Sequence, residues 1–368
     1  MNDEEPLHIV HLVCTQAFAG VERYLSYTAP ALQGLGHRIT VVGGDPTAMS
    51  RALDGTGVRF VPAGDLRRSV RVLVSTDLRR RPPDLVHAHM TQAELVAVGT
   101  KPVIRRPVVA TLHFAHRRGG SPLRRAAWSQ IPRFLDGQFA ISTAVARASG
   151  QRCTVVPSGV PVPPLRYNVA RQPVVLVAQR FEPEKDTRSA IGIWAASGLA
   201  DRGWTMQLAG SGSEEDLLRR EARDRGVQAS VRFLGFVDDL GARLDSASAF
   251  LATTPNDGLG LSVIEAMSHG LPVIAAAGGG YREVLEPVGS SHLFTPGDLD
   301  DGGRRLRDLC LDPAELSGYG ARARRRFLAE YTVDHHARRL VEAYRTVLAS
   351  RRTHDHRTTA EKPDRGAT

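Results

Sequence analysis

The stretch that decides the fold is Val174-Val175-Leu176-Val177-Ala178-Gln179-Arg180-Phe181-Glu182-Pro183-Glu184-Lys185, an apolar run that ends in charged residues. Residues 174–178 have the uninterrupted apolar character of a strand buried on both faces, and a helix-like stretch follows Lys185. A strand followed by a helix is the unit of a parallel sheet, because parallel neighbours need a long crossover connection. Repetition of this unit would define an α/β fold.

The unit recurs in both directions along the chain. Short apolar runs alternate with longer amphipathic stretches, and the runs are His8–Val13, Arg38–Val42, Leu85–His89, Val108–Leu112, Gln138–Ile141, Val174–Ala178, Thr205–Ala209, Val231–Leu234, Ala249–Ala252 and Pro272–Ala275. The alternation predicts an α/β protein with two doubly wound, Rossmann-like parallel sheets, one in each half of the chain.

Prolines mark the boundary between the two sheets. Residues 160–174 contain Pro161, Pro163, Pro164 and Pro173, which predict a stiff, extended linker. We expect an N-terminal domain over residues 1–165 and a C-terminal domain over residues 166–332, with the carboxyl ends of both sheets facing one central cleft. A helix over residues 333–350 and a disordered polar tail over residues 351–368 should complete the chain.

The net charge of +9 is confined to the first half. Residues 1–165 hold 20 Lys and Arg against 11 Asp and Glu, whereas residues 166–368 hold 28 of each. The excess arginines either form solvated faces or attract an anionic acceptor or an anionic membrane surface. Nucleic acid is not expected as a partner, because no aromatic interleaving accompanies them. They include Arg67, Arg68, Arg79, Arg80, Arg81, Arg105, Arg106, Arg117, Arg118, Arg124 and Arg125.

The expected location is the cytoplasm, with the inner face of the membrane as an alternative. No apolar run approaches the length of a membrane helix, and residues 1–13 lack the order of a secretion signal. Cys14, Cys153 and Cys310 fit neither a disulfide framework nor a zinc site. Richness in arginine and alanine suggests a bacterial source with a GC-rich genome.

Two cations and one glycine loop in the second half predict a diphosphate site. Arg180 and Lys185 stand at a helix entrance, where they could stabilise the charge of a departing nucleoside diphosphate. The loop Asp257-Gly258-Leu259-Gly260-Leu261-Ser262-Val263-Ile264-Glu265-Ala266-Met267 opens a helix, so its N–H groups could face the donor while Glu265 reaches a ribose diol. Asp298-Leu299-Asp300 has the spacing of a metal-binding motif, but we interpret it as a helix cap.

The first half offers weaker signals. Gly20 begins a helix directly after the first strand, where free N–H groups could face a phosphate or a sugar hydroxyl, or it could simply make a tight turn. His113 ends a strand and could hold a hydroxyl of the transferred sugar. His87 and His89 lie on one face of a strand. No third metal ligand is evident beside them, so we favour a packing or acceptor-side role, and no metal site is expected.

Taken in order, these motifs resemble the family 4 glycosyltransferases of GT-B fold, from about His8 to Leu348. The element from Asp257 to Glu265 resembles the family's Glu-x7-Glu signature. The resemblance implies that Arg180 and Lys185 grip the donor diphosphate and that Glu265 binds the ribose. It also implies that Gly20 lies beside phosphate, that His113 lies near the transferred sugar, and that the final helix crosses back to the first domain.

The resemblance further implies a metal-independent hexosyltransferase that retains anomeric configuration, with no cofactor and a nucleotide-sugar donor. A UDP-sugar is favoured and GDP-mannose is the alternative, while the acceptor is an unidentified small molecule or lipid-linked hydroxyl. Four residues depart from the family pattern: Asp257 replaces Glu, Ala19 replaces a second Gly, Gln179 replaces Gly, and Ser158 replaces Asn. Two other functions stay open, a nucleotide-sugar binder that has lost turnover and a nucleotide-sugar epimerase.

Overall fold

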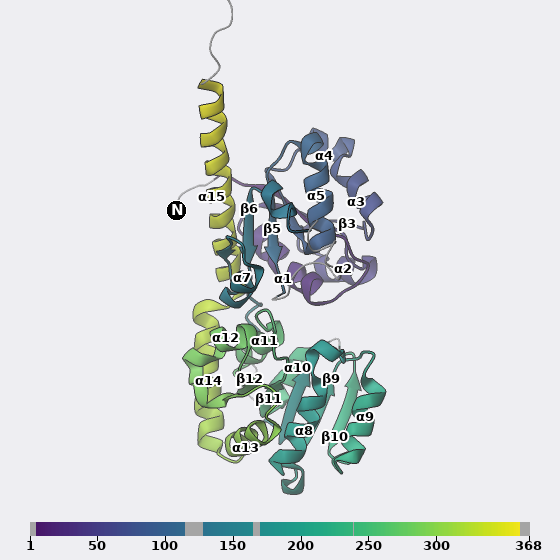
Figure 1. Cartoon of the computed structure of the whole chain (residues 1–368), viewed down its shortest axis with the longest axis vertical. Coiled ribbons are helices and arrows are strands. Elements are labelled where there is room, and N and C mark those ends of the chain that lie inside the picture. Colours follow the sequence, from purple (N-terminus) through teal and green to yellow (C-terminus); the bar gives the residue numbers. More distant parts are fainter. Residues whose placement is uncertain (1–4, 115–127, 165–169, 238, 361–368) are drawn as a thin grey trace, which may run out of the picture. The chain divides into compact units, whose positions relative to one another are not determined.

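The computed structural model describes residues 5–114, 128–164, 170–237 and 239–360. The chain divides into two compact units, each built on one sheet (Figure 1). Unit 1 comprises Met1–Ile141, Ala146–Val156 and Val333–Thr368, and unit 2 comprises Ser142–Val145 and Pro157–Thr332. Arg117, Arg118, Arg124 and Arg125 of the basic first half, residues 165–169 of the expected linker and residues 361–368 of the expected tail lie outside the described residues.

Unit 1 contains a seven-stranded parallel sheet with the order β3-β2-β1-β4-β5-β6-β7. Its strands are β1 (His8–Val13), β2 (Arg38–Val42), β3 (Arg59–Val61), β4 (Leu85–His89), β5 (Val108–Leu112), β6 (Gly137–Ala140) and β7 (Thr154–Val155). Its helices are α1 (Gly20–Gly34), α2 (Pro46–Leu53), α3 (Leu66–Leu73), α4 (Thr76–Arg80), α5 (Met90–Ile104), the 3-10 turn Ile131–Phe134, α7 (Thr143–Ser149), whose first turn is grouped with unit 2, and α15 (Val333–Ala360).

The central strands of unit 1 are buried on both faces, as their unbroken apolar character predicts. Every residue of β1 and β4 is buried, and the two strands pair in parallel with His11 opposite His87. Helix α15 packs against α1, and the hydroxyl of Tyr24 lies 2.9 Å from Nε2 of His336. The last helix of the chain therefore completes the core of the first unit.

Unit 2 contains a six-stranded parallel sheet with the order β10-β9-β8-β11-β12-β13. Its strands are β8 (Val174–Ala178), β9 (Thr205–Ala209), β10 (Val231–Gly235), β11 (Ala249–Ala252), β12 (Val273–Ala276) and β13 (Leu293–Phe294). Its helices are α8 (Thr187–Ser197), α9 (Glu215–Asp224), α10 (Leu240–Ser246), α11 (Leu261–Ser268), α12 (Gly279–Gly289), α13 (Leu299–Cys310) and α14 (Pro313–Glu330), with 3-10 turns at Pro183–Lys185, Ala200–Arg202 and Ser290–His292.

Two doubly wound parallel sheets are therefore confirmed. One expectation about the chain end is wrong: α15 does not stop at residue 350 but continues to Ala360. The sequence contains neither glycine nor proline between Ser350 and Ala360, so nothing in the backbone forces the helix to end there. Asp298 caps α13 as predicted, because its carboxylate accepts a hydrogen bond from Asp301 N–H at 2.9 Å.

Candidate functional site

The strand order of unit 2 reverses between β8 and β11, the position where open α/β sheets bind ligands. The loop after β8 carries Arg180 and Lys185, and the loop after β11 carries Asp257 to Gly260. The carboxyl ends of these two neighbouring parallel strands lie at the same edge of the sheet. Both sequence motifs that were predicted to bind a donor are thus brought to one place.

Lys185 and Asp257 form an ion pair at this edge. The Lys185 Nζ donates to Oδ2 of Asp257 at 2.8 Å, and the two side chains are 23% and 17% exposed. The other carboxylate oxygen accepts a hydrogen bond from Leu259 N–H at 3.3 Å. The pair is shielded enough from water for its electrostatics to matter, and it presents a fixed cation beside the glycine loop.

Arg180 forms a different ion pair, with an exposed glutamate of its own loop. Its guanidinium lies 2.7 Å from a carboxylate oxygen of Glu184, four residues further on, and both side chains are more than half exposed. Exposed pairs of this kind contribute at most about 1 kcal/mol, so a stronger anion could take the guanidinium away from Glu184 at little cost. Arg180 lies on the same loop as Lys185 but does not share its partner.

Gln179, which departs from the family pattern, has a structural role in this loop. Its side-chain amide donates to the carbonyl of Lys185 at 3.0 Å and to the hydroxyl of Thr187 at 2.9 Å. Thr253, at the end of β11, donates to the carbonyl of Asp186 at 2.9 Å. These contacts tie the turn that carries Lys185 to both central strands. Sequence reasoning overlooked Thr253.

Glycines let the 257–260 loop pack tightly against the start of α12. Gly279 has φ +52°, and a Cβ there would lie 2.2 Å from the carbonyl oxygen of Asp257. The next residue, Gly280, donates its N–H to that same carbonyl at 2.8 Å. Gly260, with φ +88°, is the N-cap residue of α11 and has a left-handed conformation. The absence of side chains in the run Gly278-Gly279-Gly280 makes this close contact possible.

The other residues that were predicted to bind the nucleotide-sugar donor lie in this loop or in the helix after it. Leu259 is buried, Leu261 is the first residue of α11, and Gly258 lies between Asp257 and Leu259. Glu265, in the second turn of α11, is 9% exposed. Helix α11 therefore places this largely buried glutamate five residues after the end of the 257–260 loop.

In unit 1 the predicted residues Gly20 and His113 follow β1 and β5. Gly20 starts α1, and nothing lies within 4 Å of where its Cβ would be. The N–H of Ala19, the cap residue, is already taken by Glu22 at 2.9 Å, so a carboxylate occupies part of this helix entrance. Tyr24, one turn into α1, packs edge-on against the half-buried ring of His113 with centroids 5.0 Å apart.

His87 and His89 are accompanied by a third imidazole that sequence reasoning did not find. His11 lies on the adjacent strand β1, and ring nitrogens of the three residues lie within 4.8 Å of one another. Burial lowers the pKa of His11 to about 3, and burial likewise holds the pKa of His87 and His89 well below the usual range. The cluster is neutral at pH 7 and lies among buried aromatic rings.

The rings of this cluster are held by specific partners. His87 has Tyr344 Oη at 2.6 Å from Nδ1 and Thr111 Oγ1 at 2.7 Å from Nε2. A signal was present in the alternation His87-Ala88-His89, which puts both rings on one face. The contribution of His11 depends on strand order, which the sequence does not state.

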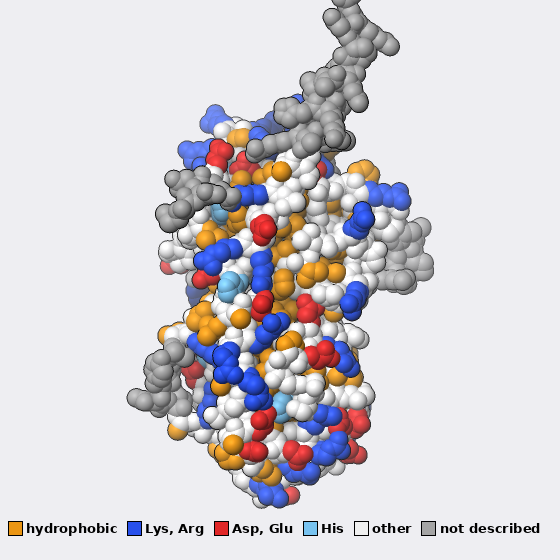
Figure 2. Space-filling view, turned by 90° about the vertical axis from the view of Figure 1, so that its left-hand side faces the viewer, with side chains coloured by type: hydrophobic (Ala, Val, Ile, Leu, Met, Phe, Trp, Pro, Cys, Tyr) orange, Lys and Arg blue, Asp and Glu red, His pale blue; other side chains and the backbone are white. Residues whose placement is uncertain are grey.

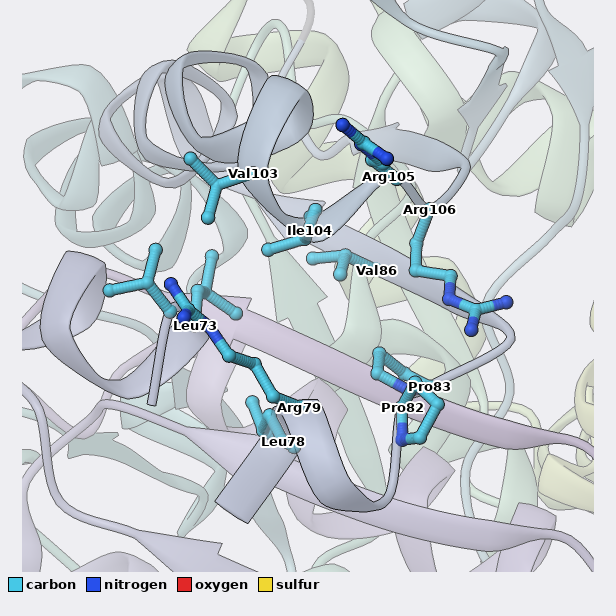
Figure 3. A pocket seen from close by; sticks show the side chains of 11 residues that line it. Leu73, Leu78, Arg79, Pro82, Pro83, Val86, Val103, Ile104, Arg105 and Arg106 are labelled. Atoms are coloured by element: carbon cyan, nitrogen blue, oxygen red, sulfur yellow. The ribbon is translucent and has the colours of Figure 1, made fainter. Parts of the chain in front are cut away.

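Unit 1 also has a pocket of about 290 Å³ at the opposite, amino edge of its sheet, near the starts of β4 and β5. Leu73, Leu78, Val86, Val103 and Ile104 are among its apolar lining residues. Figure 3 shows Arg79, Arg105 and Arg106 around these side chains. On the face drawn in Figure 2, blue and red side chains are intermingled over both units, so the charge excess does not form one continuous basic surface there.

Among the described residues, no helix has both the length and the apolar character that crossing a bilayer requires.

The two parallel sheets and the charged loops after β8 and β11 define a doubly wound α/β protein with a candidate ligand site at the switch point of unit 2. Residues 18–162 match the family model described as Glycosyltransferase Family 4, and residues 167–326 match the model described as Glycosyl transferases group 1. The chain belongs to glycosyltransferase family 4. It is accordingly an enzyme that transfers a sugar.

The relatives of this chain carry the names of different sugar-transferring enzymes. The chain is 25% identical to a glycogen synthase of Mycobacterium tuberculosis, covering 85% of this chain and 87% of the relative. It is 28% identical to a phosphatidyl-myo-inositol mannosyltransferase of Mycobacterium leprae, covering 73% and 74%. Among solved structures, Anabaena HepE in complex with UDP and glucose has a TM-score of 0.78 at 22% identity, covering 92% of this chain and all of that one.

Proposed function

We propose that this chain transfers a hexose from a UDP-sugar to an acceptor hydroxyl, retaining anomeric configuration and using no metal ion. The observation that carries the proposal is the Lys185–Asp257 pair at the switch point of unit 2, 2.8 Å apart and beside a glycine loop that opens a helix. A nucleotide-sugar is a donor whose leaving group is a diphosphate. The donor is supported by the UDP bound in the HepE structure, and GDP-mannose is the alternative.

Each unit 2 residue has a role in this proposal. Lys185 holds the diphosphate, and Arg180 joins it by leaving its exposed pair with Glu184. The N–H groups at the start of α11 add partial positive charge, and Glu265 receives the ribose hydroxyls. Asp257 orients hydroxyls of the transferred sugar after the diphosphate has taken over Lys185.

The reaction needs no side-chain base. The bond between the anomeric carbon and the diphosphate oxygen breaks, and the leaving group takes the electron pair. The acceptor oxygen then forms its bond on the same face of the sugar, and its proton passes to the departing phosphate oxygen. Preorganised cations stabilise the charge that the leaving group gains, which lowers the barrier more than it strengthens binding of the intact donor.

The residues of unit 1 have acceptor-side and sugar-side roles. His113 contacts a hydroxyl of the transferred sugar, and Gly20 leaves open space beside the first N–H groups of α1. We expect the reaction in the cytoplasm of a bacterium, which is consistent with Cys14, Cys153 and Cys310 being free thiols.

A calorimetric titration with UDP, GDP and ADP, followed by NMR of the product formed from the matching donor, tests this proposal. We expect UDP to bind most tightly, an α-linked donor to give an α-linked product, and EDTA to leave turnover unchanged. Loss of turnover in EDTA, or no affinity for any nucleoside diphosphate, would falsify it. An epimer formed from donor alone would identify the epimerase alternative. Turnover that appears only in Asp257→Glu would identify the inactive-binder alternative.

We also propose that unit 1 approaches anionic lipid through its arginine-rimmed pocket. Arg79, Arg105 and Arg106 have no ion-pair partner among the described residues, and they surround an apolar lining. Basic side chains near an anionic surface contribute about 1 kcal/mol each. Sedimentation with phosphatidylglycerol vesicles should therefore weaken when Arg105 and Arg106 are both changed to Gln. Equal sedimentation of the double variant and the wild type would exclude this contact.

A further inference from the structure

Three imidazoles form a row across the sheet of unit 1. His11 on β1, His89 at the end of β4 and His113 after β5 are its members. Nδ1 of His11 lies 3.0 Å from Nε2 of His89, and Nδ1 of His89 lies 3.0 Å from Nε2 of His113. His11 and His89 are fully buried whereas His113 is half-buried, so the row runs from the core to a residue at the carboxyl edge of the sheet.

The protons on this row cannot be placed independently. Each nitrogen–nitrogen contact holds one proton, and a neutral imidazole carries only one. Burial, with a smaller contribution from His336, lowers the pKa of both His11 and His113 to about 3, and burial also lowers that of His89. All three rings are therefore neutral at pH 7. Either every ring carries its proton on Nδ1, or every ring carries it on Nε2.

The buried end of the row decides between these two arrangements. Nε2 of His11 is buried and has no hydrogen-bond partner among the described residues. With every proton on Nε2, this atom would be a buried N–H without an acceptor. With every proton on Nδ1, it is a bare lone pair. In folded proteins, orphaned buried backbone N–H groups are rarer than under-satisfied buried acceptors, and we apply the same preference to this ring nitrogen.

We propose that His11 and His89 are positioning residues that hold His113 as the neutral Nδ1–H tautomer. His11 donates to His89, His89 donates to His113, and the Nδ1–H of His113 remains as a donor for a substrate oxygen. Donation from His113 to a substrate oxygen rests on the proposed function, whereas the tautomer of His113 does not. The row thus gives the His113 ring a defined donor without giving it a charge.

A metal ion is the competing occupant of this region, since His11, His87 and His89 lie close together. Five of their six ring nitrogens, however, already lie at hydrogen-bond distance from protein atoms: both in His87, both in His89 and Nδ1 of His11. A metal would have to break several of these contacts. The hydrogen-bonded row needs no such rearrangement, which favours it over a metal site.

Long-range 1H–15N NMR of the full chain carrying 15N-imidazole histidine tests the row without any requirement for turnover. The spectrum contains its own control, because Nδ1 of His37 accepts the Leu7 N–H at 3.1 Å and a neutral His37 must then carry its proton on Nε2. We expect His113, assigned by its loss in His113→Gln, to show the opposite pattern at pH 7. The pattern of His37, or that of a charged ring, at His113 would overturn the proposal. So would about one metal ion per chain by elemental analysis.

Two substitutions at the buried end test the positioning role. His11→Leu removes the donor to His89 and should let His113 populate both tautomers. His11→Asn places an amide N–H where Nδ1 stood and should restore the single tautomer. The kcat for transfer should fall roughly tenfold in His11→Leu, the equivalent of one hydrogen bond, with KM for the donor unchanged, and should recover in His11→Asn.

The two proposals fail in distinguishable ways. A mixed tautomer with unchanged kcat would refute the positioning role alone, and absence of transfer in the wild type would refute the proposed function while the NMR spectrum still judged the row. If His11→Leu does not fold, the wild-type spectrum remains decisive.

Discussion

Replacement of Lys185 by alanine isolates the contribution of one cation to donor binding. Lys185 and Asp257 are 23% and 17% exposed, so their contact is mostly shielded from water. A hydrogen bond to a charged group under these conditions contributes about 1.5–3 kcal/mol. If the diphosphate takes the place of Asp257 as the partner of Lys185, the variant should bind UDP roughly tenfold to a hundredfold more weakly.

The chain offers a closely matched control. Lys101 and Asp136 in unit 1 lie 2.7 Å apart and are 25% and 20% exposed, nearly the same values as the pair in unit 2. Lys101→Ala also removes the closest cation from a shielded carboxylate, but Arg351 Nη1 still lies 3.6 Å from Asp136. We therefore expect Lys101→Ala to lower the thermal midpoint in the same direction as Lys185→Ala and by a smaller amount. Titration calorimetry with UDP should detect a raised Kd in Lys185→Ala and an unchanged Kd in Lys101→Ala.

The partner of Lys185 should give the opposite sign. Asp257→Asn removes a negative charge beside the proposed diphosphate position and frees the cation from a competitor. We expect its affinity for UDP to stay the same or to rise, while kcat for sugar transfer falls.

The prediction for Lys185→Ala has a clear refuting result. A change of less than about twofold in the affinity of Lys185→Ala for UDP would refute the reasoning, since that is well below the effect of one charged hydrogen bond.

Three further predictions concern the loop, the cap and the buried imidazoles. Gly279→Ala should lower the free energy of unfolding by about 1–3 kcal/mol and weaken UDP binding, because φ is +52° and the new Cβ would meet the Asp257 carbonyl. Gly99 lies in a helix with open space around it, so Gly99→Ala should instead raise the free energy of unfolding by about 0.5–1 kcal/mol. Urea midpoints compare the two variants, and shifts of the same sign would contradict this prediction. Asp298→Ala should cost about 1 kcal/mol through loss of the cap and leave sugar transfer unchanged, whereas activity that is lost and then restored by Mn²⁺ would reveal a metal site. Stability should fall as pH drops below 6.5, because the folded pKa of His11 is about 3 and the unfolded chain therefore takes up the proton first. His11 alone contributes up to about 1.4 kcal/mol per pH unit to this slope. Urea unfolding at several pH values should therefore show a shallower slope in His11→Asn than in the wild type.

The central strands were predictable because they are buried on both faces. Residues 174–178 form β8 over the range that the apolar run indicated, and the same is true of β1 and β4. The strands that the sequence did not reveal are β3, β7 and β13, which have two or three residues each and lie at sheet edges. An edge strand pairs on one side only, so a short stretch without a sustained apolar run suffices, and its pattern is too brief to read.

The composition of the site was easier to predict than its pairings. Arg180, Lys185 and Asp257 could be assigned to strand ends, and a shared edge follows from parallel strands. That Lys185 contacts Asp257, 72 residues away, depends on β8 and β11 being neighbours. His11 was overlooked for the same reason, because its place opposite His87 follows from strand order and register. The partner of Arg180, in contrast, stands at the readable i+4 position.

The two units have corresponding strand orders, but the side chains at the switch point of each sheet differ in charge. At the switch point of unit 2 the loops present a cation, Lys185, with its counterion, whereas the corresponding strands of unit 1, β1 and β4, contribute uncharged imidazoles to the row that ends at His113. Under the proposed function this difference has a physical reason. A leaving diphosphate gains negative charge and is stabilised by a cation, while positive charge develops on the anomeric carbon. A charged His113 would oppose that positive charge, and a neutral ring with a fixed N–H can hold a sugar hydroxyl without doing so.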